Sequence, residues 1–156
     1  MPRFVEQFGV QPTKAAATLL FSLPGMPLLY YGQEIGLIQT REQMQWDKTG
    51  SDLFEFYKKL LNLRRDELVL RQGDFEFIEN DKPNSVLSYR LELATDDVLV
   101  LINFSDLPVR VTPEIGATQT DLIFSNRERG PGIHKVDLNN TNLDAYGFMI
   151  IRIFPE

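Results

Sequence analysis

The sequence contains no cysteine and a single histidine among its 156 residues. The absence of cysteine excludes a disulfide scaffold, a cysteine-ligated zinc site and a thiol nucleophile. One histidine also excludes a histidine-rich metal site, so we expect neither a metal nor a cofactor. Basic side chains are outnumbered by acidic ones, which gives a formal net charge of −6. That charge argues against a general affinity for nucleic acid or for an anionic membrane surface.

Long uninterrupted apolar runs are also missing. The longest apolar stretch extends from Ala15 to Tyr31, but Pro24, Gly25 and Pro27 interrupt it. A membrane-spanning helix needs about 20 consecutive apolar residues, so we predict a soluble chain without a membrane span. The N-terminus carries no apolar segment with a cleavage site of the signal-peptide kind. The location is left open by the sequence, with the cytoplasm favoured.

The composition that is present is that of a folded globular protein, with 43% hydrophobic and 24% charged residues. The charge is unevenly distributed along the chain. Residues 1–67 carry eight basic and eight acidic side chains, whereas residues 68–156 carry eight basic and fourteen acidic ones. This difference indicates two modules, and we place the boundary between residues 67 and 68.

Residues 1–67 show a helix, an apolar run and a second helix. The first helix is predicted from Pro12, and Leu23–Gly25 ends it. The run 26–31 is apolar without alternation, as in a parallel strand covered on both faces. A second helix, capped by Ser51 or Thr49, should end near Asp66. One strand between two helices cannot satisfy its own edges, so this segment resembles a slice of a larger βα repeat, or self-associates.

The hydrophobic period changes to two after Leu68, which predicts short strands. Turn residues separate the strands, and the run 98–103 is apolar on both faces, as a central strand would be. The spacing is typical of an antiparallel β-sandwich, so we predict an α+β chain. The predicted strands cover residues 74–79, 85–92, 98–103, 109–112, 120–124, 135–138 and 147–154.

Four residues around the apolar run form a recognisable pattern. Gly25, Pro27, Gly32 and Glu34 have the spacing G-x-P-x-x-x-x-G-x-E. This string resembles an element of the α-amylase family of glycoside hydrolases. The resemblance implies that the run is the eighth strand of a catalytic (β/α)8 barrel.

Further landmarks of the same family follow in order along the chain. Arg3 resembles the arginine that follows the Asn-His-Asp motif of the family. Residues 41–47 resemble its R-T-P-M-Q-W-D loop, although Glu42 and Gln43 replace Thr-Pro. Residues 56–65 resemble the last barrel helix, and residues 70–75 the start of the C-terminal β-domain. The resemblance therefore covers the whole chain and implies the end of a barrel followed by a sandwich.

The resemblance also implies where the chemistry lies. The family's retaining mechanism uses an aspartate nucleophile, a glutamate acid/base and a second aspartate, all on earlier barrel segments. We therefore expect no catalytic residue in this chain. Its expected partners are the rest of the catalytic barrel and an α-glucan or oligosaccharide substrate.

A few residues are candidates for contact with substrate. Gln33 and Glu34 follow the apolar run directly, at the end of the strand where barrel enzymes place their sites. Glu34 could face that site, or it could be a structural acid bonded to loop amides or an arginine. Trp46 could stack on a sugar or hold its loop together. We interpret His134 as a solvated loop histidine, and Arg64–Arg65 as a charged helix end.

Three functions are compatible with these features. The first is the C-terminal portion of a retaining α-amylase-like hydrolase of α-glucans or oligosaccharides, which lacks the catalytic acids and is inactive alone. The second is a non-catalytic carbohydrate-binding or interaction module. The third is a fragment of a transglycosylase or isomerase of the same family.

Overall fold

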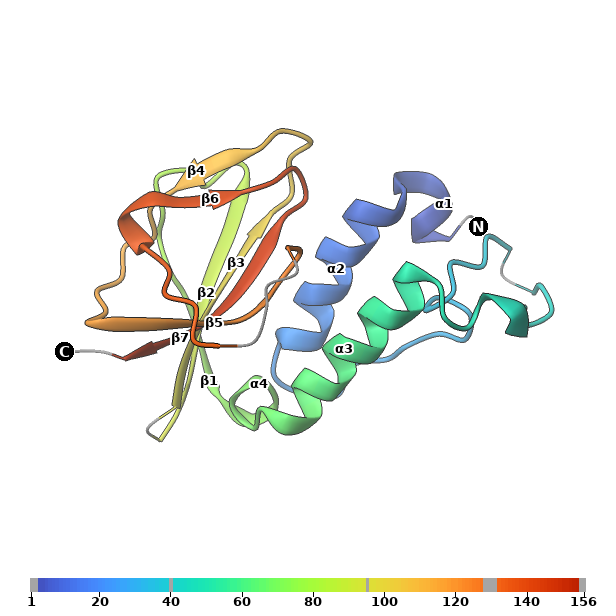
Figure 1. The fold of residues 1–156 in the computed structure, drawn as a ribbon, viewed down its shortest axis with the longest axis horizontal. Helices are drawn as coiled ribbons and strands as arrows, with labels where there is room; N and C mark the ends of the chain where they lie inside the picture. Colours follow the sequence, from blue (N-terminus) through green and yellow to red (C-terminus); the bar gives the residue numbers. More distant parts are fainter. Residues whose placement is uncertain (1–2, 40, 95, 128–131, 155–156) are drawn as a thin grey trace.

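A computed structural model describes residues 3–39, 41–94, 96–127 and 132–154. Its helices lie together on one face of a five-stranded sheet, and a two-stranded ribbon covers the other face (Figure 1). This is the α+β architecture with an antiparallel sandwich that the sequence predicts. The helices are α1 (Phe4–Phe8), α2 (Val10–Ser22), α3 (Asp52–Asp66) and α4 (Val69–Gln72), with short 3-10 turns η1 (Trp46–Lys48) and η2 (Leu138–Asn140).

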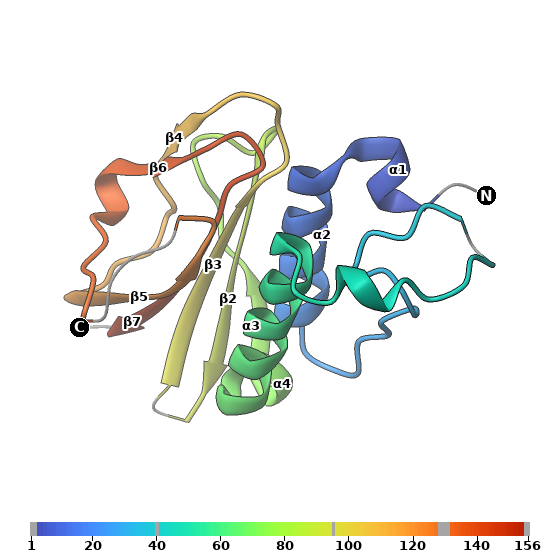
Figure 2. The same cartoon turned by 45° about the vertical axis from the view of Figure 1, so that its right-hand side comes forward.

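The two long helices follow the sequence signals closely. Helix α2 begins two residues before Pro12, which therefore lies in the first turn, where a missing N–H breaks no helical hydrogen bond. Ser51 caps α3, since its hydroxyl accepts a hydrogen bond from the Phe54 N–H at 3.3 Å, and the helix ends at Asp66 as predicted. Figure 2 shows α2 and α3 side by side against the sheet.

The strand predicted over residues 26–31 is not formed. Residues 26–30 are irregular, and a turn begins at Tyr31. A strand exists only through hydrogen bonds to a neighbouring strand, and no described segment pairs with this run. The apolar pattern therefore has no sheet in this chain to join.

The five-stranded sheet has the order β1-β2-β3-β7-β5, and every neighbouring pair is antiparallel. The ribbon is formed by β4 and β6. The strand bounds are β1 (Asp74–Phe77), β2 (Val86–Leu93), β3 (Asp96–Asn103), β4 (Val109–Val111), β5 (Gln119–Ser125), β6 (Thr141–Leu143) and β7 (Phe148–Phe154).

Strand β3 shows why the sandwich has two cores. Val98, Val100 and Ile102 belong to the core shared with the helices. Leu99 and Leu101 belong to the core under the β4–β6 ribbon. Successive side chains on a strand point to opposite faces, so an apolar run without alternation fits a strand buried on both sides. The prediction of a central strand is confirmed.

Two strand predictions near the C-terminus differ from the structure. Residues 135–137 are irregular rather than a strand, and Leu138 begins η2. The Thr120 hydroxyl contacts this segment instead, donating to the Val136 carbonyl at 2.8 Å and accepting from its N–H at 2.7 Å. Strand β6 was not predicted, because it has only three residues and two of them, Thr141 and Asn142, are polar.

Arg64 joins α3 to the chain segments around it, which corrects its interpretation as a charged helix end. The side chain is buried, and its guanidinium donates to the carbonyls of Phe21, Leu23, Gly25 and Leu70. These carbonyls lie at the end of α2, just beyond it, and in α4. Burial, with a smaller contribution from the charge of Arg71, lowers the pKa of Arg64 below its usual range.

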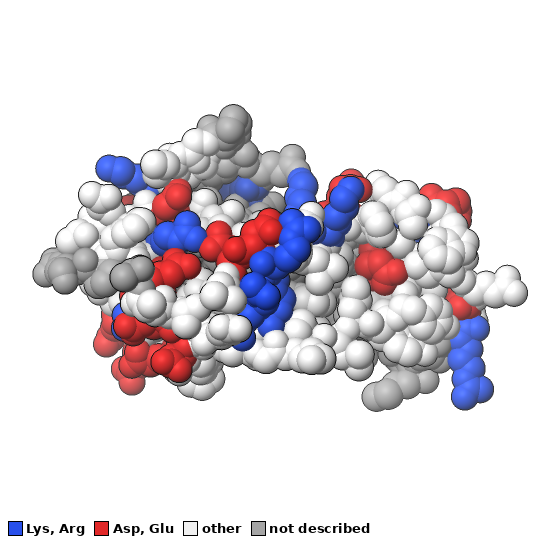
Figure 3. All heavy atoms as spheres, turned by 90° about the horizontal axis from the view of Figure 1, so that it is seen from below, with Lys and Arg blue, Asp and Glu red and all other residues white. Residues whose placement is uncertain are grey.

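Charge is distributed unevenly over the surface as well as along the chain. In Figure 3 acidic side chains gather over the sandwich end of the face shown, and basic ones form a band near the middle. The opposite end, formed by the N-terminal segment and its loops, shows mostly white surface with scattered acidic patches and one protruding basic side chain in this view. The sandwich therefore contributes most of the negative surface of this face.

Candidate functional site

The turn after the apolar run owes its shape to two glycines. Gly32 and Gly36 have φ of 75° and 70°, in the left-handed region that residues with a Cβ rarely occupy. The Leu37 N–H donates to the Gly32 carbonyl at 2.9 Å, which closes the turn. A Cβ at Gly32 would lie 2.2 Å from the Leu37 Cδ1. The second glycine of the G-x-P-x-x-x-x-G-x-E pattern is thus required by backbone conformation and by space.

Arg3 lies against this turn and contacts both of its sides. The side chain is 9% exposed. Its Nη1 donates to the Tyr31 carbonyl at 2.7 Å, and its Nε donates to the Gln39 carbonyl at 3.0 Å. Its Cζ lies 5.0 Å and 5.2 Å from the ring centroids of Tyr30 and Tyr31. The structure therefore brings the landmark Arg3 together with the loop that carries Gln33 and Glu34.

Gln33 and Glu34 lie in the turn, on the side of α3. The Gln33 Nε2 donates to the Tyr57 hydroxyl at 3.1 Å. Burial raises the pKa of Tyr57 to about 12, the hydrogen bond from Gln33 opposes that shift, and the charge of Glu34 adds to it. Tyr57 is therefore a neutral phenol at physiological pH, suited to hold the turn rather than to transfer protons.

Glu34 and Arg3 each have one buried polar atom without a partner. These are the Glu34 Oε2 and the Arg3 Nη2, and both lack a hydrogen bond within the described part of the chain. An unsatisfied buried polar group costs about 1–3 kcal/mol. Within the described ranges, Oε2 of Glu34 accepts no hydrogen bond from a loop amide or an arginine. Oε2 therefore gives no support to the interpretation of Glu34 as a structural acid.

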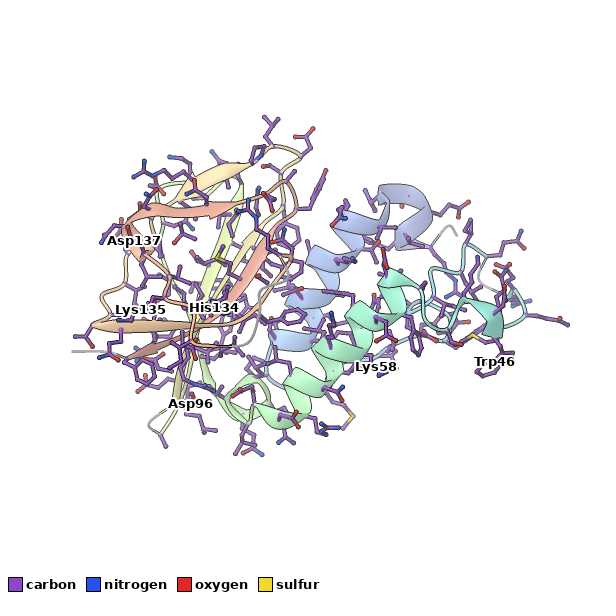
Figure 4. The ribbon with its side chains drawn as sticks, in the orientation of Figure 1. Trp46, Lys58, Asp96, His134, Lys135 and Asp137 are labelled. Atoms are coloured by element: carbon purple, nitrogen blue, oxygen red, sulfur yellow. The ribbon has the colours of Figure 1, made fainter. Side chains whose placement is uncertain are left out.

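Trp46 occupies a different turn, η1, in the loop that leads to α3 (Figure 4). The residue is 72% exposed. The loop is held instead by Glu42, whose carboxylate accepts from the Gln45 side chain and whose carbonyl accepts from the Tyr31 hydroxyl at 3.2 Å. The indole is thus an exposed flat apolar surface rather than a core anchor.

The apolar run next to the turn is strongly exposed. Met26 is 96% exposed and Leu28 is 81% exposed, and both tyrosines that follow remain more than two-fifths exposed. Exposed apolar side chains clustered in one segment mark a surface for contact with further protein or ligand. The run was expected to be covered on both faces, but here only Leu29 packs against the core shared with the helices, and most of the run is uncovered.

The remaining candidates lie elsewhere. His134 lies at the opposite end of the molecule from Trp46 (Figure 4), where its N–H donates to the Asp121 carboxylate at 3.2 Å and its carbonyl accepts from Leu122. Within the described ranges no three His, Cys, Asp or Glu residues are grouped to hold a metal ion. Among the same residues, no helix is long and apolar enough to cross a membrane.

Sequence reasoning missed the contacts of Arg3 and Tyr57. Arg3 was expected only as a family landmark, and Tyr57 only as one of the residues 56–65 that resemble the last barrel helix. The partners of Arg3 lie 28 and 36 residues away along the chain, and Tyr57 lies 24 residues from Gln33. No local periodicity indicates such contacts.

Comparison with known proteins gives consistent relatives, although no family model matches the chain. The chain is 34% identical over 134 residues to the alpha-amylase MalA of Haloarcula japonica, a match that covers 82% of this chain and 20% of that protein. It is 32% identical over 162 residues to a cyclomaltodextrinase of Geobacillus thermopakistaniensis, covering 97% of this chain and 27% of the relative. The chain thus spans about a quarter of the length of these two relatives.

Solved structures show the same fold. The chain superposes on a noncanonic maltogenic alpha-amylase, AmyB, of Thermotoga neapolitana with a TM-score of 0.81 and 21% identity. This superposition covers 99% of the chain and 39% of that structure. The arrangement of helices and sandwich is therefore one that occurs within larger proteins.

Proposed function

The chain belongs to the α-amylase family of glycoside hydrolases, and we propose that it is the C-terminal portion of a retaining hydrolase of α-glucans or oligosaccharides. In this proposal residues 1–67 close the catalytic (β/α)8 barrel. Residues 68–156 form the antiparallel sandwich that follows it. The partner of the chain is then the rest of the barrel, and the sugar binds where the two parts meet.

The exposed apolar run carries this proposal. Burying a side chain such as Met26 or Leu28 contributes roughly 1.5–3 kcal/mol, and both are almost fully exposed here. The same segment has the composition of a strand and pairs with nothing in the described chain. A neighbouring barrel strand would supply the missing hydrogen bonds and cover the apolar side chains.

The catalytic carboxylates belong outside this sequence in the proposal. A retaining glycosidase places two carboxyl groups about 5 Å apart, one as nucleophile and one as acid/base. Glu34 lies in a turn against Tyr57, whose pKa is raised chiefly by burial and further by the charge of Glu34. We assign Gln33, Glu34 and Trp46 to the loop that faces substrate, without a catalytic role.

An activity assay tests the proposal. The purified 156-residue chain is incubated with soluble starch and with maltoheptaose, and released reducing sugar is measured beside the Geobacillus thermopakistaniensis cyclomaltodextrinase as positive control. We expect no release above the blank. Release that disappears in the Glu34→Gln variant would show that this carboxyl is catalytic and would overturn the assignment.

A second candidate is a carbohydrate-binding module without chemistry. The exposure of Trp46 favours it, because an open indole can stack on a pyranose ring. Tight binding of maltoheptaose by the chain alone, lost in Trp46→Ala, would favour this candidate over a barrel segment. A transglycosylase or isomerase of the family would share the same structural role for the chain.

A further inference from the structure

We propose that Arg3 is a positioning residue that closes the loop from Tyr31 to Gln39. This loop carries Gln33 and Glu34, and its role beside a substrate rests on the proposed function. The positioning itself is a property of the chain and is independent of any sugar.

The first support is the pair of carbonyls that Arg3 joins. Nη1 binds the Tyr31 carbonyl at 2.7 Å, where the loop begins, and Nε binds the Gln39 carbonyl at 3.0 Å, where it ends. Only a planar guanidinium offers several donors in a fixed fork that can bind two acceptors at once. Arg3 therefore links the two ends of the loop by hydrogen bonds.

The second support is the surroundings of the charge. Arg3 is nine-tenths buried, yet no carboxylate of a described residue lies within ion-pair distance of it. The faces of Tyr30 and Tyr31 lie about 5 Å from its Cζ, where a cation is attracted to an aromatic ring. The side chain is thus held by backbone carbonyls and rings of the very segment that it closes.

The middle of the loop is held separately. The Gly36 N–H donates to the Gln33 carbonyl at 3.2 Å, and the Leu37 N–H donates to the Gly32 carbonyl at 2.9 Å. The Gln33 side chain also binds Tyr57 on α3. If Arg3 is removed, the ends of the loop lose their link, so these inner hydrogen bonds should open more often.

Amide hydrogen exchange measured by NMR on the full 156-residue chain tests whether Arg3 links the ends of the loop. The variants are Arg3→Met, which removes all donors, and Arg3→Lys, which keeps the charge without the fork. Arg41→Lys is the matched control, because Arg41 is an exposed arginine near the same loop. We expect the Gly36 and Leu37 amides to exchange at least tenfold faster in both Arg3 variants, and at the wild-type rate in the control.

Two further readouts distinguish the loss of this link from a general loss of stability. The Gln33 side-chain amide resonances should shift in both Arg3 variants, while the amides of β3 and β7 keep their wild-type exchange. Unchanged exchange at Leu37 in Arg3→Met would overturn the proposal. Equal acceleration in β3, or full wild-type protection in Arg3→Lys, would overturn it as well. None of these readouts involves sugar or turnover, so a failure of the proposed function leaves them unaffected.

Discussion

Replacing Arg64 by methionine should be among the most destabilising single changes in this chain. The substitution keeps much of the apolar stem but removes every donor. The lost hydrogen bonds include those from Nη1 to the carbonyls of Phe21 at 2.7 Å, Leu23 at 2.8 Å and Leu70 at 2.8 Å. A fourth, from Nη2 to Gly25, is lost as well.

The magnitude follows from what stays behind. Each buried carbonyl left without a donor costs about 1–3 kcal/mol, and the hydrogen bonds to Phe21 and Leu70 are fully buried. Removing the buried cation returns part of this cost, because its desolvation is no longer needed. We expect a net loss of roughly 3–5 kcal/mol. For a domain of this size, that corresponds to a fall in Tm of roughly 6–20 °C.

Urea denaturation followed by circular dichroism measures this loss, with Arg65→Met as the matched control. Arg65 is one position away on the same helix, but it is exposed, and among the described residues its ion pair is with the neighbouring Asp66. The control should lose less than about 0.5 kcal/mol. Arg64→Lys should fall between the two, because an ammonium has three donors without the planar fork. A loss below about 1 kcal/mol in Arg64→Met would refute the reasoning.

Three further predictions address separate parts of the structure. Gly32→Ala should destabilise the chain by about 2–4 kcal/mol in urea denaturation, because of backbone strain and a clash of the new Cβ. Gly25→Ala has open space around its Cβ position and should cost about 1 kcal/mol. Equal losses would contradict the turn geometry. The hydrogen bond from the Arg127 side chain lowers the pKa of Asp144 from 3.8 to about 2. The stability that this pair contributes is therefore present above pH 3.8 and is lost as the pH falls through 2. Asp144→Asn should flatten the dependence of stability on pH in that window, and an unchanged profile would argue against the pair. Trp46→Ala should leave Tm within about 1–2 °C of the wild-type value, because the indole is 72% exposed. The substitution should also remove the fluorescence of the single tryptophan. A large fall in Tm would mean that the indole packs against the rest of the chain.

The sandwich could be predicted from sequence because its information is local. The period-two pattern and the turn residues located β1 to β5 and β7 within two residues, and the run 98–103 was correctly predicted as central. Two predictions were wrong for a shared reason: strand β6 was missed, and a strand was predicted over the irregular segment 135–137. Short segments are decided by the partner that they meet, such as the Thr120 hydroxyl at Val136, rather than by their own residues.

The candidate site shows the same limit from the other side. Gly32 and Glu34 were recognised by their spacing, and the turn explains the glycine. The roles of Arg3 and Arg64 were underestimated, because most of the carbonyls that they bind lie 28 to 43 residues away in sequence. Every residue has a backbone carbonyl, so residue type does not indicate which one is bound. The run 26–31 was predicted as a strand from its composition, but no described segment pairs with it.

The most direct test of the central claim compares two proteins in one assay. The first is the 156-residue chain alone, and the second is the same chain in frame with the coding sequence upstream of Met1, both incubated with maltoheptaose. We expect an upstream Asn-His-Asp, release of reducing sugar by the longer protein, and none by the chain alone. Turnover by the chain alone, or an upstream sequence without barrel landmarks and without activity, would contradict it.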